Sequence, residues 1–199
     1  FIAYKVQNRL MSVISFMVFH EISTKPNTPK PQWLIDELRS DHAGETGAVW
    51  IYRGILSMTR EDSVKEFAKH HLETEESHLE SIENFLDKKD RSILLPLWKI
   101  LGFLTGALPA LIGSRVVFAT ISAVENFVVL HYQTQIHRLK NENIHPHIRS
   151  VLQSCCDDEA EHESEAMKLL NDQPGKMLNI WCLLISVGSK VAVKLARVV

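Results

Sequence analysis

The segment Asp158-Glu159-Ala160-Glu161-His162 places a carboxylate and an imidazole three residues apart. On a helix, residues at this spacing point the same way, about one turn apart, so Glu159 and His162 can reach one metal ion. The same Glu-x-x-His spacing recurs in di-iron carboxylate four-helix bundles. With 16 Glu and 10 His in the chain, about one such pair arises by chance. The sequence contains three, which are Glu75/His78, Glu142/His145 and Glu159/His162.

Length and composition exclude several other classes of protein. A chain of 199 residues is expected to form one domain with a sizeable core, with room for an appendage. Its net charge of −2 with both signs mixed gives no basic field for nucleic acid. The three cysteines contain no CxxC, which argues against a disulfide scaffold or zinc site and favours a reducing compartment. The chain begins with Phe1 rather than Met, so we expect trimming and a missing targeting segment.

Apolar residues recur at helical spacing along the chain after its first 31 residues. Residues 1–31 contain a short apolar run and a proline-rich linker, expected to lie outside the main domain. Residues 32–199 are expected to form an all-α, ferritin-like four-helix bundle domain. The expected bundle helices cover residues 32–59, the stretch from a break at 60–63 to about 86, 114–139 and 146–170, and an additional C-terminal amphipathic helix covers 176–197.

The pair Glu142/His145 lies in a predicted turn just before Pro146, so it has no helical face and is discarded. A di-iron bundle needs one further carboxylate from each of the two remaining helices. Residues 32–59 offer Glu45, and residues 114–139 offer Glu125, the only acidic residue of that segment. A Glu on such an apolar face is costly to bury unless it is paired, protonated or bound to metal.

Hairpin register tests whether these carboxylates can meet. In an antiparallel helix hairpin, residues at the same height are equidistant from the turn. The midpoint of Glu45 and Glu75 is position 60, and the midpoint of Glu125 and Glu159 is position 142, so both midpoints fall in predicted turns. Carboxylate and imidazole without thiolate suit iron or manganese better than a closed zinc site. We therefore predict a two-metal site made by Glu45, Glu75, His78, Glu125, Glu159 and His162.

Three neighbouring side chains are candidates for supporting roles. Tyr132 lies two turns after Glu125 on the same face, where it is either a core residue or part of a substrate cavity. Asp158 is placed to orient His78 from across the bundle, as carboxylates often do for metal-bound histidines. Asp41, one turn before Glu45, is a similar candidate.

Two apolar segments suggest contact with a membrane surface. Residues 93–112 are nearly all apolar, but the prolines and glycines within them disfavour a single straight span. We expect them to form the long crossover of the bundle and to lie in the membrane interface, with a true span as the alternative. Residues 176–197 place Lys and Arg opposite Trp and Leu, which suits an interfacial helix or a helix packed on the bundle.

Several motifs together resemble the demethoxyubiquinone hydroxylase family, over about residues 33–198. The most specific is Leu38-Arg39-Ser40-Asp41-His42-Ala43-Gly44-Glu45, followed by Gly47-Ala48 and Ile51-Tyr52. The other matching stretches are Glu75–His78-Leu79, Ala123-Val124-Glu125, His131-Tyr132 with Gln135-Ile136, Asp158–His162, the apolar run from Leu95-Pro96 to Thr105-Gly106, and Gly188-Ser189-Lys190.

The resemblance implies a peripheral membrane monooxygenase that hydroxylates the ring of a demethoxyubiquinol or demethoxyubiquinone during ubiquinone synthesis. Its cofactors would be two iron ions that bind and reduce O2, with electrons from NADH or from the quinol itself. Its partners would be the polyprenyl quinone, O2, the membrane surface and other proteins of ubiquinone synthesis. Its location would be the cytoplasmic face of a bacterial inner membrane or the matrix face of a mitochondrial inner membrane.

Two other functions compete with this interpretation. A di-iron ferroxidase or peroxide scavenger would use the same ligands, although the sequence lacks the paired CxxC motifs of a rubredoxin-type module. A non-catalytic quinone- or lipid-binding assembly protein would not need six matched ligands.

Overall fold

The structure is a computed structural model that describes residues 29–171 and 175–199. The predicted apolar segment and linker in residues 1–31 therefore fall almost entirely outside the described residues. The helices from residue 32 onward belong to a single compact unit, Pro31–Val199.

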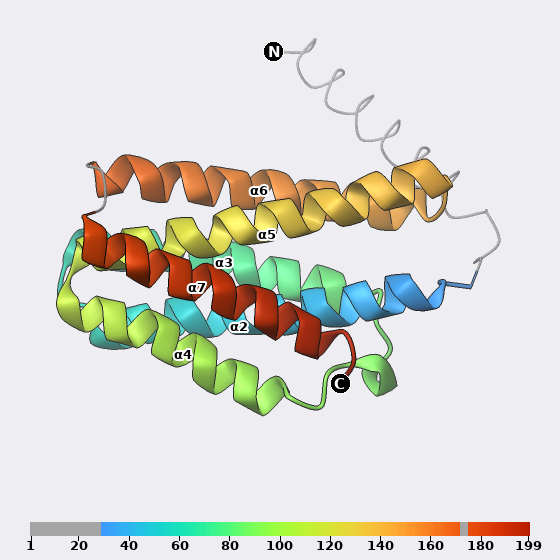
Figure 1. The fold of residues 1–199 in the computed structure, drawn as a ribbon, viewed down its shortest axis with the longest axis horizontal. Helices are drawn as coiled ribbons and strands as arrows, with labels where there is room; N and C mark the ends of the chain where they lie inside the picture. Colours follow the sequence, from blue (N-terminus) through green and yellow to red (C-terminus); the bar gives the residue numbers. More distant parts are fainter. Residues whose placement is uncertain (1–28, 172–174) are drawn as a thin grey trace, which may run out of the picture. The chain divides into compact units, whose positions relative to one another are not determined.

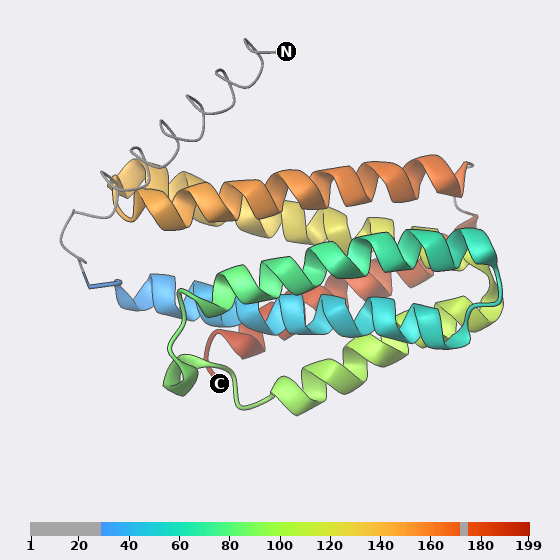
Figure 2. The same ribbon diagram turned by 180° about the vertical axis from the view of Figure 1, so that it is seen from behind.

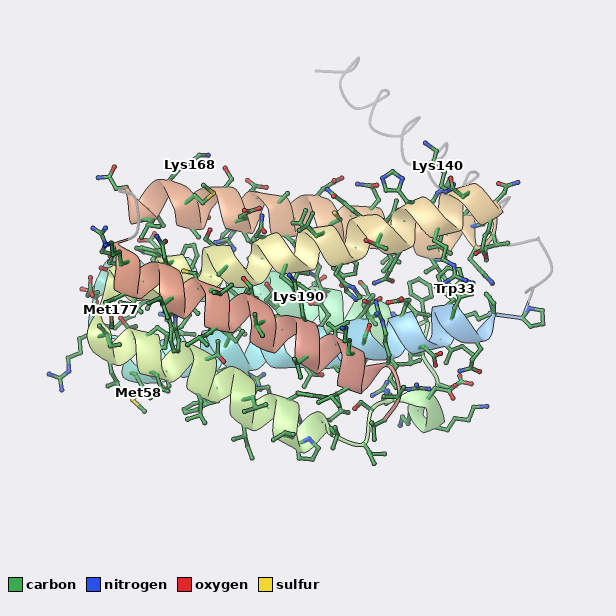
Figure 3. All side chains as sticks on the ribbon, viewed as in Figure 1. Trp33, Met58, Lys140, Lys168, Met177 and Lys190 are labelled. Atoms are coloured by element: carbon green, nitrogen blue, oxygen red, sulfur yellow. The ribbon has the colours of Figure 1, made fainter. Side chains whose placement is uncertain are left out.

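Four long helices form two antiparallel hairpins, as predicted (Figures 1 and 2). Figure 3 labels Met58, Lys168 and Met177 at one end of the helices and Trp33 and Lys140 at the other. The first hairpin turns at Thr59–Glu61, and the second turns through Asn143 and His145, which both have positive φ. The hairpin helices are α2 (Gln32–Met58), α3 (Asp62–Glu83), α5 (Ser114–Glu142) and α6 (Pro146–Leu170).

The core consists mainly of two apolar clusters at opposite ends of the hairpins. One cluster includes Leu34 and Leu139, near the turn between α5 and α6. The other includes Ile55, Val64 and Phe118, near the turn between α2 and α3. Because apolar packing fixes both ends of the hairpins, the polar residues between the clusters are held at a defined level.

The crossover between α3 and α5 differs from the expected broken segment. After a short 3-10 turn, Lys88–Asp90, it forms one helix, α4 (Leu95–Ile112), with Pro96 in its first turn. Gly102 and Gly106 do not interrupt α4, because they face α2 at very close range. A Cβ on Gly102 would meet the carbonyl oxygen of Gly47, and a Cβ on Gly106 would meet that of Ile51. The glycines therefore allow two backbones to approach, as small residues do between packed helices.

The last helix, α7 (Lys176–Ala196), lies along α5 and beside α2 (Figure 1). Of its residues only Ala196 is buried, so α7 covers the bundle without entering it. Near its start, Trp181 Nε1 donates to Thr120 Oγ1 of α5 at 2.8 Å. Just beyond its end, Arg197 donates to Glu37 Oε2 of α2 through Nε and NH2, at 3.0 and 2.8 Å.

Helices α4 and α7 both carry exposed apolar side chains. Within the described residues, three helices are long and apolar enough to cross a membrane, namely α4, α5 and α7. Isolated exposed apolar residues are ordinary on protein surfaces, but large apolar patches mark sites of contact with a membrane, a ligand or another protein. The exposed residues include Leu97, Ile100, Leu101, Leu104, Leu108 and Leu111 on α4, and Met177, Ile180, Leu183, Leu184, Val187 and Val191 on α7.

Candidate metal centre

The structure brings all six predicted ligands together in the middle of the four-helix bundle. They form two groups in which one ligand atom from each residue lies within 4.8 Å of the others. Each helix supplies the residues predicted for it, so the hairpin register is correct. The six residues are at most 4% exposed, which leaves them little access to water. The first group is Glu45, Glu75, His78 and Glu159, and the second is Glu75, Glu125, Glu159 and His162.

Glu75 and Glu159 belong to both groups, so the two groups share a pair of carboxylates. Both histidines direct Nδ1 towards this shared pair. Nδ1 of His78 lies 3.0 Å from Glu159 Oε1, and Nδ1 of His162 lies 3.1 Å from Glu159 Oε2. Nδ1 of His162 also lies 3.3 Å from Glu75 Oε1. This arrangement can hold two cations side by side with carboxylates between them.

Unpaired oxygens support a cation at this site. Glu45 Oε2 and both carboxylate oxygens of Glu75 are buried without a hydrogen-bond donor among the described residues. A buried carboxylate in that condition must take up a proton or a cation. The four carboxylates carry four negative charges when ionised, which two divalent cations would balance. Carboxylate and imidazole donors suit iron or manganese, so the residues present fit a two-metal site.

Without metal, three carboxyl groups of this cluster have pKa values above that of an ordinary glutamate. Burial, followed by the charges of Glu75 and Glu159, raises the pKa of Glu45 well above its ordinary value. Burial and the charge of Glu159 raise the pKa of Glu75 as well. The pKa of Glu125 is also raised, by burial and then by the charges of Glu159 and Glu75. Protons therefore occupy the cluster when no cation neutralises it.

The two histidines retain protons more strongly than an ordinary imidazole. Burial lowers the pKa of His78, but the hydrogen bond to Glu159 and the surrounding carboxylates outweigh burial and raise it to about 10. For His162, burial again lowers the pKa, but the hydrogen bond to Glu159 and the nearby Glu75 carboxylate outweigh burial and raise it to about 9. Metal binding must therefore displace these protons, since only neutral imidazole binds a metal ion.

Two tyrosines hold carboxylates on the helix opposite to their own. Tyr132 of α5 donates its hydroxyl to Glu45 Oε1 of α2. Tyr52 of α2 donates its hydroxyl to Glu125 Oε1 of α5 at 3.2 Å. Each tyrosine follows the glutamate of its own helix by seven residues, or two turns. In the sequence, Tyr52 was noted only as part of a family motif, although the shared spacing of seven residues was a usable signal.

The two carboxylates predicted to support the ligands lie in different surroundings. Asp158 Oδ2 lies 3.0 Å from Nε2 of His78, the ring nitrogen that faces away from the shared glutamates. This is the contact that orients metal-bound histidines in many proteins. Asp41 instead bonds to His131 and Gln135 of α5, at 3.1 and 2.7 Å.

His71 is a buried neighbour of the cluster for which the sequence predicted no specific role. Its ring meets the His162 ring edge-on with centroids 4.0 Å apart and stacks on Tyr52 at 5.8 Å. Nε2 of His71 lies 2.9 Å from Glu165 Oε2. Burial and the charges of His162 and His70 lower the pKa of His71 to about 3, so the ring is neutral. Its contacts fix the position of His162.

The discarded pair Glu142/His145 is absent from both ligand groups found among the described residues. The carboxylate of Glu142 accepts hydrogen bonds from Trp33 and Arg138, at 3.2 and 2.8 Å. His145 lies in the loop as the residue before α6. Of the three Glu-x-x-His pairs, only the two on α3 and α6 therefore belong to the ligand groups found among the described residues.

A cavity of about 310 Å³ extends from the carboxylates to the space flanked by α4 and α7. Glu45, Glu75, Glu125, Glu159 and Tyr132 line its inner part, so the prediction that Tyr132 lines a cavity agrees with the geometry. Most of its remaining wall is apolar or formed by small residues. These include Ala48, Leu101, Gly102, Val128, Leu184, Gly188 and Ala192.

Comparison with known proteins agrees with this geometry. The sequence model of the family described as ubiquinone biosynthesis protein COQ7 matches residues 32–196. A 3-demethoxyubiquinol 3-hydroxylase from Rhodospirillum rubrum is 36% identical over 141 residues, which cover 69% of this chain and 66% of that protein. The mitochondrial 5-demethoxyubiquinone hydroxylase of Saccharomyces cerevisiae is 31% identical over 196 residues, covering 83% of this chain and 84% of the yeast protein.

The human mitochondrial NADPH-dependent 3-demethoxyubiquinone 3-hydroxylase is 30% identical over 167 residues, covering 80% of this chain and 75% of that protein. The family match covers every residue of the two ligand groups. The family resemblance seen in the sequence is thus confirmed, and this chain belongs to the ubiquinone biosynthesis protein COQ7 family.

Proposed function

We propose that this protein is an O2-dependent monooxygenase that hydroxylates the ring of a demethoxyubiquinol or demethoxyubiquinone in ubiquinone biosynthesis. One observation carries the proposal: two overlapping carboxylate–histidine groups border a largely apolar cavity. The names of the relatives supply the substrate class and the reaction. A ferroxidase or peroxide scavenger would not need a cavity of this character beside the ligands.

The six ligands would hold two iron ions, with Glu75 and Glu159 shared between them. When bound, the iron pair supplies the redox chemistry by which one oxygen atom of O2 enters a ring C–H bond and the other leaves as water. That balance consumes two electrons and two protons. A nicotinamide nucleotide is the proposed electron source, because several relatives are named as NADPH-dependent.

The residues of the chain would bind and orient the substrate. Tyr132 and Tyr52 hold the outer carboxylates Glu45 and Glu125 in place through their hydroxyl groups. The buried setting keeps bulk water away from the reacting ring, which limits side reactions. The apolar cavity wall suits a quinone ring and the first units of a polyprenyl tail.

The exposed apolar rows on α4 and α7 support a peripheral membrane location. A polyprenyl tail would remain in lipid while the ring enters between the two helices. We propose the cytoplasmic face of a bacterial inner membrane or the matrix face of a mitochondrial inner membrane. The yeast and human relatives are named as mitochondrial.

The decisive experiment supplies the iron-loaded protein with a short-tail demethoxyubiquinol analogue, a reductant and ¹⁸O2. We expect a product that carries one ¹⁸O atom on the ring, detected by mass spectrometry. His78→Ala should abolish the product, whereas His70→Ala, a change at an exposed histidine of the same helix, should not. Consumption of peroxide or oxidation of ferrous iron without any ring product would overturn the proposal.

A further inference from the structure

A polar cluster interrupts the largely apolar wall of the cavity at one place. Ser40 and Asp41 of α2 meet His131 and Gln135 of α5 there, and the first three line the cavity. The side chain of Asp41 is fully buried. Burying such groups is costly unless they are bonded to each other or to a ligand.

The contacts of His131 specify which ring nitrogen carries the proton. Asp41 Oδ1 and Ser40 Oγ both lie within hydrogen-bonding distance of Nε2, at 3.1 and 3.2 Å. The Ser40 hydroxyl already donates to the carbonyl oxygen of Glu37, so its lone pair faces the ring. The amide nitrogen of Gln135 also lies 3.1 Å from Nε2, but it donates to Asp41 Oδ1. Since an ionised carboxylate can only accept, the contact with Asp41 assigns the proton of the neutral imidazole to Nε2 and the lone pair to Nδ1. Among the described residues, no hydrogen bond involves this Nδ1.

The ring plane of His131 is also fixed. Phe127, one turn earlier on α5, lies nearly parallel to the imidazole, with centroids 6.0 Å apart and planes 7° apart. Gln135, one turn later, places its amide nitrogen 2.7 Å from Asp41 Oδ1. A histidine held from both sides in this way presents its remaining nitrogen in one direction only.

The unmatched atoms of the cluster are all acceptors. Asp41 Oδ2 and Gln135 Oε1 are buried without a donor among the described residues. Of these two residues, only Asp41 lines the cavity, together with His131 and the lone pair assigned to its Nδ1. A ligand that complements this cluster must therefore bring a hydrogen-bond donor. The hydroxyl groups of a reduced quinol are such donors, whereas the carbonyl groups of the oxidised quinone are not.

We infer that His131 accepts a hydrogen bond at Nδ1 from a ring hydroxyl of the quinol and so positions the ring beside Glu45. This inference rests on the proposed function, because it names a residue that selects the redox form of that substrate. Tyr132, the next residue, bonds to Glu45, so a ring held by His131 lies close to the ligand cluster. His131 acts as a positioning residue and Asp41 sets its tautomer.

Two near-isosteric substitutions separate this role from a purely structural one. In His131→Asn, a side-chain oxygen replaces Nδ1 and the contacts of Nε2 are lost. In His131→Gln, the amide group reaches the position of Nε2 near Asp41 and Ser40, but no acceptor remains at Nδ1. The binding of a short-tail demethoxyubiquinol analogue and of its oxidised quinone form is then measured on the iron-loaded proteins.

We expect the wild-type protein to bind the quinol about tenfold more tightly than the quinone. His131→Asn should retain most of this preference, and His131→Gln should lose it. If the Gln variant keeps the preference and the Asn variant loses it, the cluster only joins α2 to α5 and the inference is wrong. Equal preference in all three proteins would overturn it too.

Controls separate this inference from the proposed function. The same two substitutions at His137, an exposed histidine on α5, should leave both affinities unchanged. Iron content and thermal unfolding of every variant establish that the site is intact. A wild-type protein that forms no hydroxylated ring refutes the proposed function, whereas a hydroxylating wild type with an unaltered Gln variant refutes only the role of His131.

Discussion

The two hairpins present the same ligands in different surroundings. In α2–α3 and in α5–α6 alike, a glutamate is followed after seven residues by a tyrosine, and a Glu-x-x-His pair faces it. Tyr52, however, packs against the rings of Phe67 and His71, and it is not among the residues that line the cavity. Tyr132 lies in the cavity wall next to His131. The repeated pattern therefore builds the carboxylate–histidine cluster, and the surroundings of each tyrosine differ in whether they include the cavity.

The covering helices differ in the same way. Helix α4 is pressed against α2 through glycines at which a Cβ would strike backbone atoms. Helix α7 lies along α5 with a single buried residue and is tied mainly by side-chain hydrogen bonds near its ends. Helix α4 is therefore packed tightly against α2, whereas α7 is packed loosely against α5.

The largest effect should come from the shared carboxylates. Glu75→Ala or Glu159→Ala disrupts both ligand groups, so we expect loss of both metal ions and hydroxylation at background level. Glu45→Ala or Glu125→Ala disrupts one group each, and about one ion per chain should remain. Metal analysis of the purified variants tests this equivalence of the hairpins. If Glu45→Ala and Glu125→Ala differ in the number of ions retained, the equivalence is wrong.

The glycines of α4 and α7 test the difference between the covers. Gly106→Ala forces a Cβ against the Ile51 carbonyl oxygen, so we expect a loss of about 3 kcal/mol in the free energy of unfolding. Gly188→Ala on α7 meets nothing within 4 Å and should be neutral or stabilising by up to about 1 kcal/mol. Denaturant unfolding of the two variants measures both values. Similar losses in both would mean that α7 is packed as tightly as α4.

Substitution of the two tyrosines tests whether the side of the cluster that faces the cavity, near Tyr132, differs from the side that does not, near Tyr52. Tyr52→Phe and Tyr132→Phe each remove one hydroxyl donor from a buried carboxylate, so each should lower the free energy of unfolding by about 1–2 kcal/mol. Only Tyr132→Phe changes the cavity wall, and we expect it to lower kcat/KM about tenfold more than Tyr52→Phe. Steady-state kinetics with the quinol analogue measures this difference. An equal loss of activity in both variants would contradict the idea that the substrate approaches only from the side of Tyr132.

The smallest effect is the change of Tm with pH. Here both hairpins should contribute in the same direction, because each carries a histidine with a raised pKa. The folded pKa values of His78 and His162, about 10 and 9, exceed the ordinary value of 6.5. Their protons therefore stabilise the metal-free fold below pH 6.5, and this stabilisation is lost as pH rises through 9–10. We expect the Tm of metal-free protein to fall by about 5 °C between pH 6.5 and 9.5. The metal-loaded protein should lack this decline, and a metal-free Tm that rises with pH would contradict the argument.

The meeting of the six candidate ligands could be predicted from the sequence because their positions depend on short-range rules. Helical period places Glu75 with His78 and Glu159 with His162, and the distance of Glu45 and Glu125 from the turns sets their height. These rules need no knowledge of how the helices pack. The bounds of the bundle helices were predictable for the same reason, within a few residues at their ends.

Other features depend on distances between helices, which the sequence does not contain. Tyr52 has the pattern of a core residue, and only the closeness of α5 shows that its hydroxyl reaches Glu125. The glycines within residues 93–112, which include Gly102 and Gly106, were expected to disfavour a single straight span, because glycine disfavours a helix in isolation. Against the backbone of α2 they have the opposite effect and make a close helix pair possible.

That helix pair would link the depth of the protein in a bilayer, under the proposed membrane location, to the position of the candidate metal ligands. Gly102 rests on Gly47, two residues after Glu45, so a shift of α4 along α2 would require both backbones to separate. If the outer side of α4 lies in lipid as proposed, the reactive centre sits at a constant height above the acyl chains. The lipid-facing residues of α4 can then change to suit membranes of different composition while the inner glycines keep that height unaltered.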